Sequence, residues 1–451
     1  MAGRVPLGGQ RRPVSPSRLA LEVGRVGCRR DGRNRGIPRG HSGEGGDRGT
    51  SSPPSIVFTC GGTGGHIYPA VAIADRIRGC DPAIAIDFVG SRDRLEWRLV
   101  PQSGYAIRSV PCAPIRRPAA SVRNVGSALI QVLGLVKALW ILLRRRPAAV
   151  VGTGGYVTVP LCCAAWLLRI PVFLHESNAF PGLATRFLAN TLRCATKVFL
   201  GFAGARTYLA DPGAAIVTGN PVREAIARCR GGGDQGRRSR DDLVRGIFGP
   251  RHGAPLGDDT TCLCFMGGSL GAGKINEVLP KAIETLFSQF PNLAIIWQTG
   301  ERYHDRAVSA QASESEGGAT IQSTYGDRLA IVPYLEDMES VYSLSDLIVC
   351  RSGAITCSEL VASGTPSVLI PSPNVTDDHQ RKNAAALAEK DMAWVLDEAD
   401  LSSAALVHTI SEILEGNGRV LRGMRVALEG APENSACAQI TESIIDYITK
   451  L

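Results

Sequence analysis

The sequence predicts an α/β protein with two doubly wound parallel-sheet domains facing a cleft. Short apolar runs alternate with helical patterns, the alternation occurs twice, and a charged, Gly/Pro-rich stretch at residues 230–259 separates the two sets. Such alternation is typical of βαβ units, whose strands are parallel. Ligands of these sheets bind beyond the carboxyl ends of the strands. We therefore expect the functional residues in the loops that follow the strands.

The first domain is expected over residues 55–223. Its apolar runs predict strands at 55–59, 85–89, 149–152, 172–175 and 197–202. A helix is expected from Pro69 to Ile77, because proline suits the first turn of a helix. Residues 224–259 are interpreted as a linker or insertion.

The second domain is expected over residues 260–436. Its predicted strands are 260–266, 293–298, 329–333, 347–350, 367–370 and 393–396. The final segment, 437–451, has a helical pattern and is expected to pack back across the domains.

The first 54 residues have their own composition. They hold eleven Arg, no Lys and four acidic residues, a net charge of +7, whereas the remaining 39 bases and 38 acids give +1. This predicts a disordered leader. An Arg-rich, Ser-containing, acid-poor leader is typical of an organelle transit peptide, and a spurious upstream start in a GC-rich gene is the alternative. The nearly neutral remainder argues against nucleic acid as a partner.

The thirteen cysteines form no C-x-x-C pair, and neither they nor the seven histidines form a metal-like cluster. Buried small hydrophobes in a reducing compartment are the simplest interpretation. We expect no metal and no cofactor.

The segment 351–359, Arg-Ser-Gly-Ala-Ile-Thr-Cys-Ser-Glu, follows an apolar strand and opens a helix. The first amides of a helix have no intrahelical partner, and the helix dipole adds positive charge there, so the site favours phosphate. One turn later, Glu359 suits a pair of sugar hydroxyls. Phosphate plus ribose indicates a nucleotide.

Two further glycine loops follow predicted strands. The loop at 61–65 lacks the third glycine of a dinucleotide fingerprint, because Ile67 stands there. The loop at 268–274 matches G-x-x-x-x-G-K, but Ile275 replaces the Ser or Thr that holds Mg²⁺ in NTPases. No D-x-D motif occurs. Either loop alone could be a tight turn, but together with 351–359 they favour close backbone approach to a ligand.

Two features keep more than one interpretation. His66, at the mouth of the first glycine loop, could be a general base or a loop-bracing side chain. Residues 128–143 are apolar apart from Gln131 and Lys137, end in the Arg triplet 144–146, and are short for a membrane span. We expect one side of this helix to pack on the sheet and the other, with Trp140, to meet an anionic membrane surface.

Eight motifs carry a family resemblance: GGTGGHIYPA (61–70), GTGGYVTVP (152–160), HESN (175–178), GNPVR (219–223), GGSLGA (267–272), WQTG (297–300), RSGAITCSE (351–359) and DDHQRKNA (377–384). In combination, over residues 55–450, they resemble the MurG family, the UDP-N-acetylglucosamine:N-acetylmuramyl-(pentapeptide) pyrophosphoryl-undecaprenol N-acetylglucosamine transferases. IIWQTG, LIPSPNV and the Arg-rich leader resemble plastid-type members of plants and mosses. Ser177 departs from the family's H-E-Q-N, and His379-Gln380 from its paired Gln.

The resemblance implies a GT-B fold of two Rossmann-like domains, the first for a lipid acceptor and the second for UDP-GlcNAc. For the nucleotide, the resemblance assigns uracil to Arg223 and the Leu335 backbone, ribose to Glu359, and the diphosphate to Ser269 and the amides of Ala354, Ile355 and Thr356. It assigns GlcNAc to Gln380, Asn383 and Asn178. Thr63, Gly64 and Gly65 would line the diphosphate or acceptor side, and His66 is the candidate base.

The implied activity is inverting transfer of GlcNAc from UDP-GlcNAc to the C4 hydroxyl of polyprenyl-pyrophosphoryl-MurNAc-pentapeptide, a peptidoglycan precursor. The implied location is the stromal face of the plastid inner envelope, as a peripheral protein, or the cytoplasmic face of a bacterial inner membrane if the leader is not a transit peptide. A lipid galactosyltransferase acting on diacylglycerol and a non-catalytic nucleotide-sugar-binding homologue are the alternatives.

Overall fold

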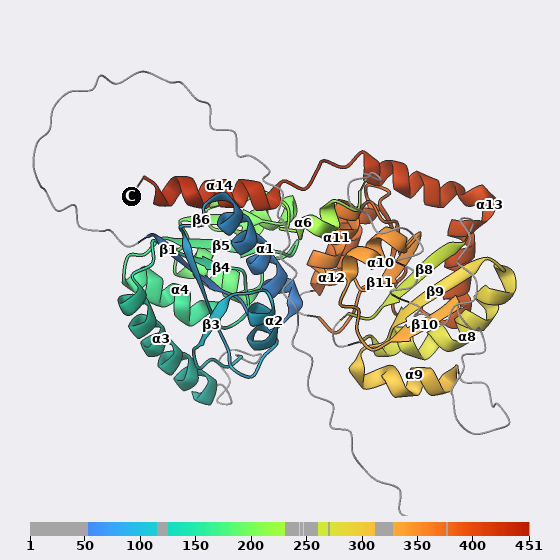
Figure 1. Cartoon of the computed structure of the whole chain (residues 1–451), viewed down its shortest axis with the longest axis horizontal. Coiled ribbons are helices and arrows are strands. Elements are labelled where there is room, and N and C mark those ends of the chain that lie inside the picture. Colours follow the sequence, from blue (N-terminus) through green and yellow to red (C-terminus); the bar gives the residue numbers. More distant parts are fainter. Residues whose placement is uncertain are drawn as a thin grey trace, which may run out of the picture. The chain divides into compact units, whose positions relative to one another are not determined.

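A computed structural model describes residues 53–114, 125–230, 243, 247, 260–268, 271–311, 328–375 and 378–450. The leader therefore lies outside the described residues, as does nearly all of 231–259. Residues 51–451 form one unit. Within it each half of the chain builds one parallel sheet (Figure 1).

The first sheet has seven strands in the order β3-β2-β1-β4-β5-β6-β7. They are β1 Ser55–Thr59, β2 Ala85–Gly90, β3 Ala106–Ser109, β4 Ala149–Gly152, β5 Val172–Glu176, β6 Lys197–Leu200 and β7 Ala215–Val217. Every pairing is parallel, with β1 between β2 and β4. The strand order reverses between β1 and β4, which is the switch point where such sheets bind ligands.

Helices cover both faces of this sheet. They are α1 Gly64–Cys80, α2 Glu96–Gln102, α3 Val125–Arg145, α4 Thr158–Leu167, α5 Leu183–Arg186 with the π-helical turn Phe187–Thr191, and the 3₁₀ turns Ala203–Tyr208 and Pro212–Ala214. The interior strands β1, β4, β5 and β6 are largely buried, apolar and rich in valine and phenylalanine, as expected for a sheet covered on both sides.

The second sheet has six strands in the order β10-β9-β8-β11-β12-β13, all parallel. They are β8 Thr261–Met266, β9 Leu293–Gln298, β10 Leu329–Val332, β11 Leu347–Cys350, β12 Ser367–Leu369 and β13 Ala393–Val395. Its switch point lies between β8 and β11, so the two halves have the same design. The prediction of two doubly wound parallel-sheet domains is confirmed.

The helices of the second half are α6 Glu224–Ala227, α8 Gly273–Gln289, α9 His304–Ala310, α10 Met338–Leu344, α11 Ala354–Ser363, α12 His379–Ala388 and α13 Ser403–Glu429, with a 3₁₀ turn at Glu301–Tyr303. The backbone of α13 leaves helical geometry at residues 415–418. Helix α6 packs against α10 and α11, and Ile226 lies in the core of the second half. Residues that we assigned to a linker therefore belong to this core.

The last helix, α14 Ala436–Ile448, lies against α1 of the first half (Figure 1). Ile440 and Ile444 are fully buried in the same apolar cluster as Ile73 and Phe173. Tyr447 places its ring edge on Phe173, with the ring centroids 5.5 Å apart. The chain therefore starts and ends its described structure in the same half.

The start of α1 differs from the prediction. The helix begins at Gly64, and Pro69 lies inside it. Proline has no N–H for the carbonyl four residues earlier, which is that of Gly65. The hydroxyl of Ser177 lies 3.4 Å from the Gly65 oxygen and donates to it. A neighbouring loop thus satisfies the carbonyl that the proline leaves unpaired.

Candidate active site

The glycine loop 61–65 leaves β1 at the switch point of the first sheet. Thr63 is the N-cap of α1, and Gly64 and Gly65 are its first residues. His66 follows on the first turn, half-buried. Its ring Nδ1 lies 2.9 Å from the Gly61 carbonyl oxygen. Because a carbonyl oxygen only accepts, Nδ1 carries the proton, and Nε2 of the neutral ring keeps a free lone pair.

The second glycine loop of this half, after β4, packs on the first. A Cβ atom at Gly155 would lie 2.4 Å from the Gly61 oxygen, and one at Gly154 would lie 2.9 Å from His66 Nε2. Both glycines also have positive φ angles. The hydroxyl of Thr153 donates to the His66 carbonyl at 2.6 Å. Only glycine at these positions lets the loops meet and leaves room beside Nε2.

The second half presents a helix start at its own switch point. Helix α11 follows β11 and begins at Ala354, with Gly353 as an N-cap that supplies no side-chain hydrogen bond. The amides of Ala354, Ile355 and Thr356 precede the first intrahelical bond, which Cys357 donates to the Gly353 carbonyl. A helix start of this kind binds an anion such as a diphosphate.

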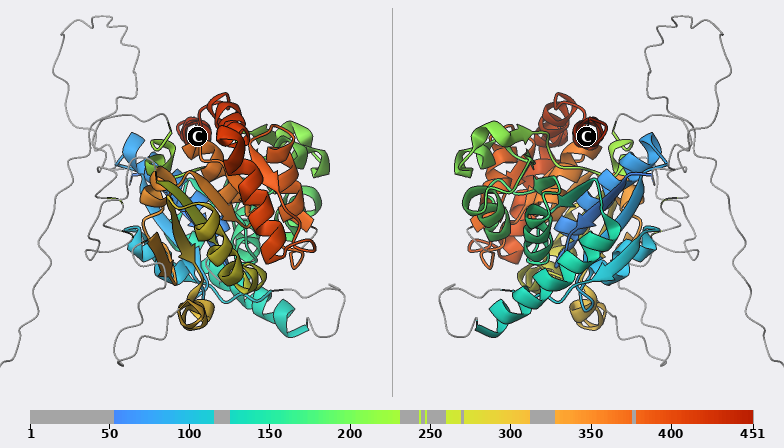
Figure 2. Two further views of the ribbon diagram at one scale, coloured as in Figure 1. Left: turned by 90° about the vertical axis from the view of Figure 1, so that its right-hand side faces the viewer. Right: turned by 90° about the vertical axis from the view of Figure 1, so that its left-hand side faces the viewer.

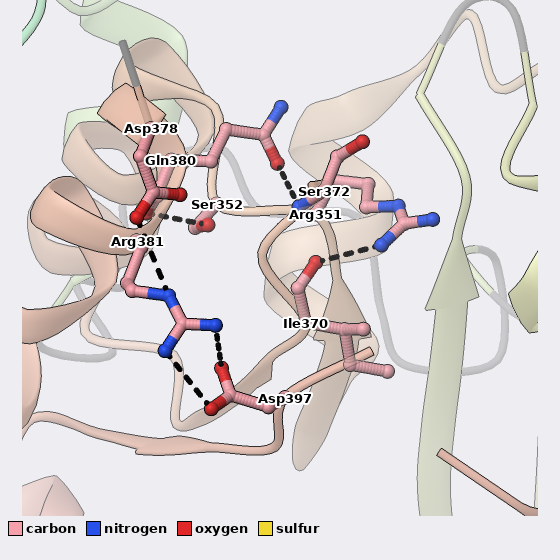
Figure 3. Close-up of polar contacts among 8 residues, drawn as sticks. All are labelled: Arg351, Ser352, Ile370, Ser372, Asp378, Gln380, Arg381 and Asp397. Carbon is pink, nitrogen blue, oxygen red and sulfur yellow. Dashed lines mark hydrogen bonds and ion pairs between the residues drawn. The ribbon is translucent and has the colours of Figure 1, made fainter. Parts of the chain in front are cut away.

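Figure 3 shows how neighbouring side chains hold this helix start. The Ser352 hydroxyl donates to the Gln380 carbonyl at 2.9 Å, and the Gln380 side-chain oxygen accepts the Ser372 amide at 2.9 Å. Arg351 donates to the Ile370 carbonyl at 3.1 Å (Figure 3). Its guanidinium also forms an ion pair with Glu398. The amide nitrogen of Gln380 points away from these contacts. The Gln380 side-chain oxygen thus holds the loop, and its nitrogen remains a donor, as the predicted role in sugar binding requires.

The start of α12 is held separately. Arg381 forms ion pairs with Asp378 at 3.4 Å and with Asp397 at 3.1 Å (Figure 3). Asp378 is the N-cap and has a left-handed backbone conformation. These contacts fix the turn that carries Gln380 onto the helix.

Glu359 and Arg223, which we predicted to hold ribose and uracil, contact each other. Arg223 Nη2 lies 3.2 Å from Glu359 Oε1, and the Tyr342 hydroxyl donates to Glu359 Oε2 at 3.0 Å. The Arg223 guanidinium also lies over the Tyr68 ring, 4.9 Å from its centroid. Burial raises the pKa of the Glu359 carboxyl, and the charge of Arg223 opposes that rise. The Tyr68 hydroxyl is 3.0 Å from that of Tyr334.

Asn383 and Asn178 are less available for a sugar than predicted. Asn383 is fully buried; its oxygen accepts the Ala179 amide at 3.1 Å and its nitrogen donates to the Ser352 carbonyl at 3.2 Å. The Asn178 side-chain nitrogen donates to Glu176 at 3.1 Å. In this arrangement Asn383 joins the two halves. The Asn178 side-chain nitrogen is used within its own loop, which leaves its side-chain oxygen as the group that faces no donor among the described residues.

Glu176 braces the loop that carries Asn178. Its carboxylate accepts the Asn178 amide, the Gly182 amide at the start of α5 and the Thr185 hydroxyl at 2.6 Å. The residue is buried. Its role is to cap a helix and fix the loop after β5.

Asn220 is a second bridge between the halves. Its side-chain nitrogen donates to the Ser177 carbonyl at 3.0 Å and to the Ser358 hydroxyl at 2.9 Å. A Cβ atom at Gly201 would collide with the Asn220 side chain at 2.2 Å. Each bridge joins a loop that follows a strand of the first sheet to a residue on α11 or just before it. The carboxyl ends of the two sheets therefore meet, and His66 and the α11 start belong to one region.

His175, on β5, is buried beside these groups. Burial, together with the charge of His66, lowers its pKa to about 3. The Ser177 hydroxyl lies 3.5 Å from its Nδ1. His175 is therefore neutral at ordinary pH and does not compete with His66 as a proton acceptor in the open part of the site.

The second-half glycine loop is not a nucleotide-triphosphate loop. Lys274 points to Glu277, 3.1 Å away, in a surface ion pair on α8. The Gln298 side chain donates to the Gly268 carbonyl at 3.2 Å, which holds the loop on β9. Ser269, predicted to bind the diphosphate, lies outside the described residues. The backbone of Leu335 belongs to the same half, and its side chain is buried in the core.

Two buried residues of the site were missed by the sequence interpretation. Glu96, the first residue of α2, accepts the amides of Gly62 and Ser91, both at 3.0 Å. Asn220 was quoted only as part of a motif. Single polar residues next to apolar ones carry no periodic signal. A useful clue was available, because a carboxylate or amide beside glycine-rich turns often satisfies their backbone.

Helix α3 combines a packed side and an exposed apolar side. It packs on α4, but most of its apolar length is not buried. Its exposed large apolar residues are Val125, Leu129, Ile130, Val132, Leu133, Val136, Trp140 and Leu143. Figure 2 shows its N-terminal end standing clear of neighbouring ribbons. By length and composition, α3 is the one helix in the described part of the chain that could cross a membrane.

The basic end of α3 is only partly free. Arg145 forms an ion pair with Asp87 at 3.3 Å, while the Arg144 guanidinium lies 4.3 Å from the Trp140 ring centroid. Arg144 and Trp140 therefore form the cationic and aromatic end of the exposed side.

Comparison with known families agrees with this geometry. The profile of the glycosyltransferase family 28 N-terminal domain matches residues 56–198, and that of the family 28 C-terminal domain matches residues 262–436. Two parallel-sheet domains whose strand ends meet, with an uncapped helix start at the switch point of the second, and the two family 28 matches define a GT-B glycosyltransferase.

Individual relatives narrow the family. The UDP-N-acetylglucosamine--N-acetylmuramyl-(pentapeptide) pyrophosphoryl-undecaprenol N-acetylglucosamine transferase of Salinibacter ruber is 37% identical over 85% of this chain and 94% of its own. The transferase of the same name from Natranaerobius thermophilus is 33% identical over 87% of this chain and 100% of its own length. The crystal structure of Acinetobacter baumannii MurG matches with a TM-score of 0.62 and 25% identity, over 87% of this chain and all of that one. The chain belongs to the MurG family.

Proposed function

We propose that this chain transfers GlcNAc from UDP-GlcNAc to the C4 hydroxyl of a polyprenyl-pyrophosphoryl-linked MurNAc-pentapeptide. Membership of the MurG family supports the substrates, since the relatives are named for this reaction. The observation that carries the mechanism is the meeting of an uncapped helix start in one half with a histidine whose Nε2 is free in the other.

The mechanism follows from these groups. The acceptor hydroxyl attacks C1 of GlcNAc on the side opposite UDP, so the configuration inverts. His66 Nε2 takes the hydroxyl proton as the bond forms. The α11 amides at 354–356 stabilise the negative charge that develops on the departing UDP. Glu359 binds the ribose hydroxyls after its contact with Arg223 rearranges, which frees Arg223 for the uracil.

The direct test is transfer of labelled GlcNAc to an undecaprenyl-pyrophosphoryl-MurNAc-pentapeptide analogue. Residues 55–451 would be assayed in detergent with UDP-GlcNAc, with UDP-galactose as the matched donor control, and with and without EDTA. Transfer from UDP-GlcNAc alone that survives EDTA supports the proposal. Donor binding without transfer, or transfer of galactose to diacylglycerol, would overturn it.

We also propose that the exposed side of α3 holds the protein on an anionic membrane surface. The apolar residues exposed on α3, with Arg144 and Trp140 at one end, suit an interface where apolar and charged groups meet. The acceptor carries a lipid chain, so this position would bring the site to its substrate. Co-sedimentation with phosphatidylglycerol vesicles tests it, and lack of pelleting would contradict it.

We further propose that residues 1–54 are a plastid transit peptide and that the enzyme works on the stromal face of the inner envelope. The arginine-rich, acid-poor composition supports this. Import of a fluorescent fusion of residues 1–54 into isolated chloroplasts, with cleavage, is the expected result. No import would favour the upstream-start interpretation and the cytoplasmic face of a bacterial membrane.

A further inference from the structure

One peptide group of the first glycine loop is held at both ends. The carbonyl of Gly61 accepts the His66 Nδ1 proton at 2.9 Å. The N–H of Gly62 belongs to the same peptide group and donates to Glu96 Oε2 at 3.0 Å. The Glu96 carboxylate and the His66 imidazole are therefore joined through a single peptide.

The loop is built around the Glu96 carboxylate. Glu96 is 1% exposed, and its other oxygen accepts the Ser91 amide at 3.0 Å. A Cβ atom at Gly61 would lie 2.7 Å from Glu96 Oε1, and one at Gly90 would lie 2.7 Å from Glu96 Cγ. Any side chain at either glycine would displace the carboxylate. Both hydrogen bonds that the Glu96 carboxylate accepts within the described part of the chain come from backbone amides. Such a carboxylate is a strong acceptor, because charge-assisted hydrogen bonds are stronger than neutral ones.

The charge of Glu96 acts on the far end of the peptide. Hydrogen bonds in a chain polarise one another, and a carboxylate at the N–H makes the carbonyl of the same peptide a better acceptor. The stronger acceptor favours the proton on His66 Nδ1 and so keeps Nε2 unprotonated in the neutral ring. In catalytic triads a carboxylate does this by direct contact with the histidine; here a peptide lies between them.

The second glycine loop prevents the ring from turning to another partner. Gly155 approaches the Gly61 carbonyl and Gly154 approaches the ring, as described above. The Thr153 hydroxyl fixes the His66 backbone. The His66 Nδ1 lies 2.9 Å from the Gly61 carbonyl oxygen and 3.5 Å from the Thr63 hydroxyl oxygen, so the carbonyl is the nearer acceptor for its proton. Glu96 sets the strength of that nearer acceptor.

We propose that Glu96 is a positioning residue for transfer, and that it fixes the tautomer of His66 through the Gly61–Gly62 peptide. This inference rests on the proposed role of His66 as the base. A purely structural role, in which Glu96 only satisfies two amides, predicts a change in stability and no change at the His66 ring.

Glu96→Gln is the variant that separates these roles. It keeps the shape and one acceptor oxygen but removes the charge. With ¹⁵N-histidine labelling, the wild-type His66 spectrum should show the Nδ1–H tautomer, and Glu96→Gln should shift population to Nε2–H. The expected kcat falls about tenfold, with KM for UDP-GlcNAc unchanged, because the charge-assisted bond is replaced by a weaker neutral one. Glu412→Gln, on α13 in the other half, is the control and should change neither readout.

A double-mutant cycle with His66→Ala completes the test. If Glu96 acts through His66, Glu96→Gln should cause no further loss of kcat in the His66→Ala background. Additive losses, or an unchanged His66 tautomer in Glu96→Gln, would overturn the inference. Full activity of His66→Ala would instead overturn the base role in the proposed function, and the tautomer measurement would still decide whether Glu96 controls the ring. Thermal unfolding of each variant identifies those that fail to fold.

Discussion

The Arg223 guanidinium lies 3.2 Å from the Glu359 carboxylate, so the two groups predicted to bind the uracil and the ribose of a nucleotide contact each other. Arg223 precedes α6, and Glu359 is on α11. This ion pair therefore also links the segment that connects the two halves to helix α11. A nucleotide that takes both groups exchanges one set of contacts for another. Donor binding and the position of the connection are therefore coupled.

The first prediction concerns Glu359. Glu359→Ala should raise the Kd of UDP-GlcNAc about ten- to a hundredfold, because hydrogen bonds to a charged group contribute about 1.5–3 kcal/mol. Isothermal calorimetry measures this. Tyr342→Phe removes only the hydroxyl that donates to Glu359 and is the matched control with a smaller expected effect. An unchanged donor affinity in Glu359→Ala would refute the ribose role.

The second prediction concerns His66. His66→Ala should lower kcat by about 10²- to 10⁴-fold, the usual contribution of a positioned general base. The Kd of UDP-GlcNAc should stay within about twofold, because no α11 group is changed and transition-state interactions affect turnover. Single-turnover kinetics with calorimetry separates the two. Equal losses of turnover and donor affinity would remove the base assignment.

The third prediction is a pH dependence of stability from His175. Its pKa is about 3 in the fold against 6.5 for an ordinary histidine. Between these values the unfolded chain binds a proton that the folded chain does not, so stability falls as the pH drops below 6.5. The slope is up to about 1.4 kcal/mol per pH unit.

Urea unfolding at about pH 5 and pH 7 measures this slope, since histidine titrates in that range. His175→Gln should remove it, whereas His408→Gln, at an exposed position on α13, should keep it. The same pH slope in wild type and His175→Gln would contradict the assignment.

The fourth prediction concerns the bridge at Asn220. Asn220→Asp keeps the size but replaces the donor with a carboxylate that faces the Ser177 carbonyl, so it should destabilise the protein more than Asn220→Ala does. Each should cost about 1–3 kcal/mol or more, the penalty for buried groups left unpaired. Denaturant unfolding compares them. Asn434→Ala, which removes the donor to the Asn220 backbone carbonyl but keeps the Asn220 side chain, is the comparison variant. A more stable Asn220→Asp than Asn220→Ala would show that the donor is unimportant.

The fifth prediction concerns the exposed side of α3. Leu133→Gln and Trp140→Gln should each weaken binding to phosphatidylglycerol vesicles by about tenfold, since burying one large apolar side chain contributes about 1.5–3 kcal/mol. Val426→Gln, at an exposed apolar position on α13, is the matched control. Equal vesicle binding by all three variants would place the membrane contact elsewhere.

The interior strands were predictable because they are buried on both faces. The run at residues 293–298 was predicted with the bounds of β9, and residues 149–152 with those of β4. The edge strands β3 and β7 were missed. The residues of β3 alternate between exposed and half-buried, and β7 has only 3 residues, so neither strand gives an apolar run. Short edge strands depend on their neighbour in the sheet rather than on their own composition.

The site was predictable where backbone geometry defines it and less so where side chains pair. Glycine loops and a helix start can be recognised from residue types, and the structure has His66 in the first turn after a glycine loop and residues 354–356 at a helix start, as expected. The partners of Glu359 and Asn383 could not be read in this way, because Arg223 and Ala179 are far away in sequence. Glu359, predicted to bind ribose, and Asn383, predicted to bind GlcNAc, both have partners within the protein. Long-range polar contacts need the fold before they can be assigned.

The packing of α14 on α1 has a consequence for biosynthesis. Ile440 and Ile444 complete an apolar cluster that otherwise belongs to the first half. A ribosome makes the first half early, yet that half lacks these two side chains until translation is almost finished. Domains generally fold as units during synthesis, starting from the N-terminus. In this chain the second half has all of its own core residues before the first half does, so the half that is made first is the last to become complete.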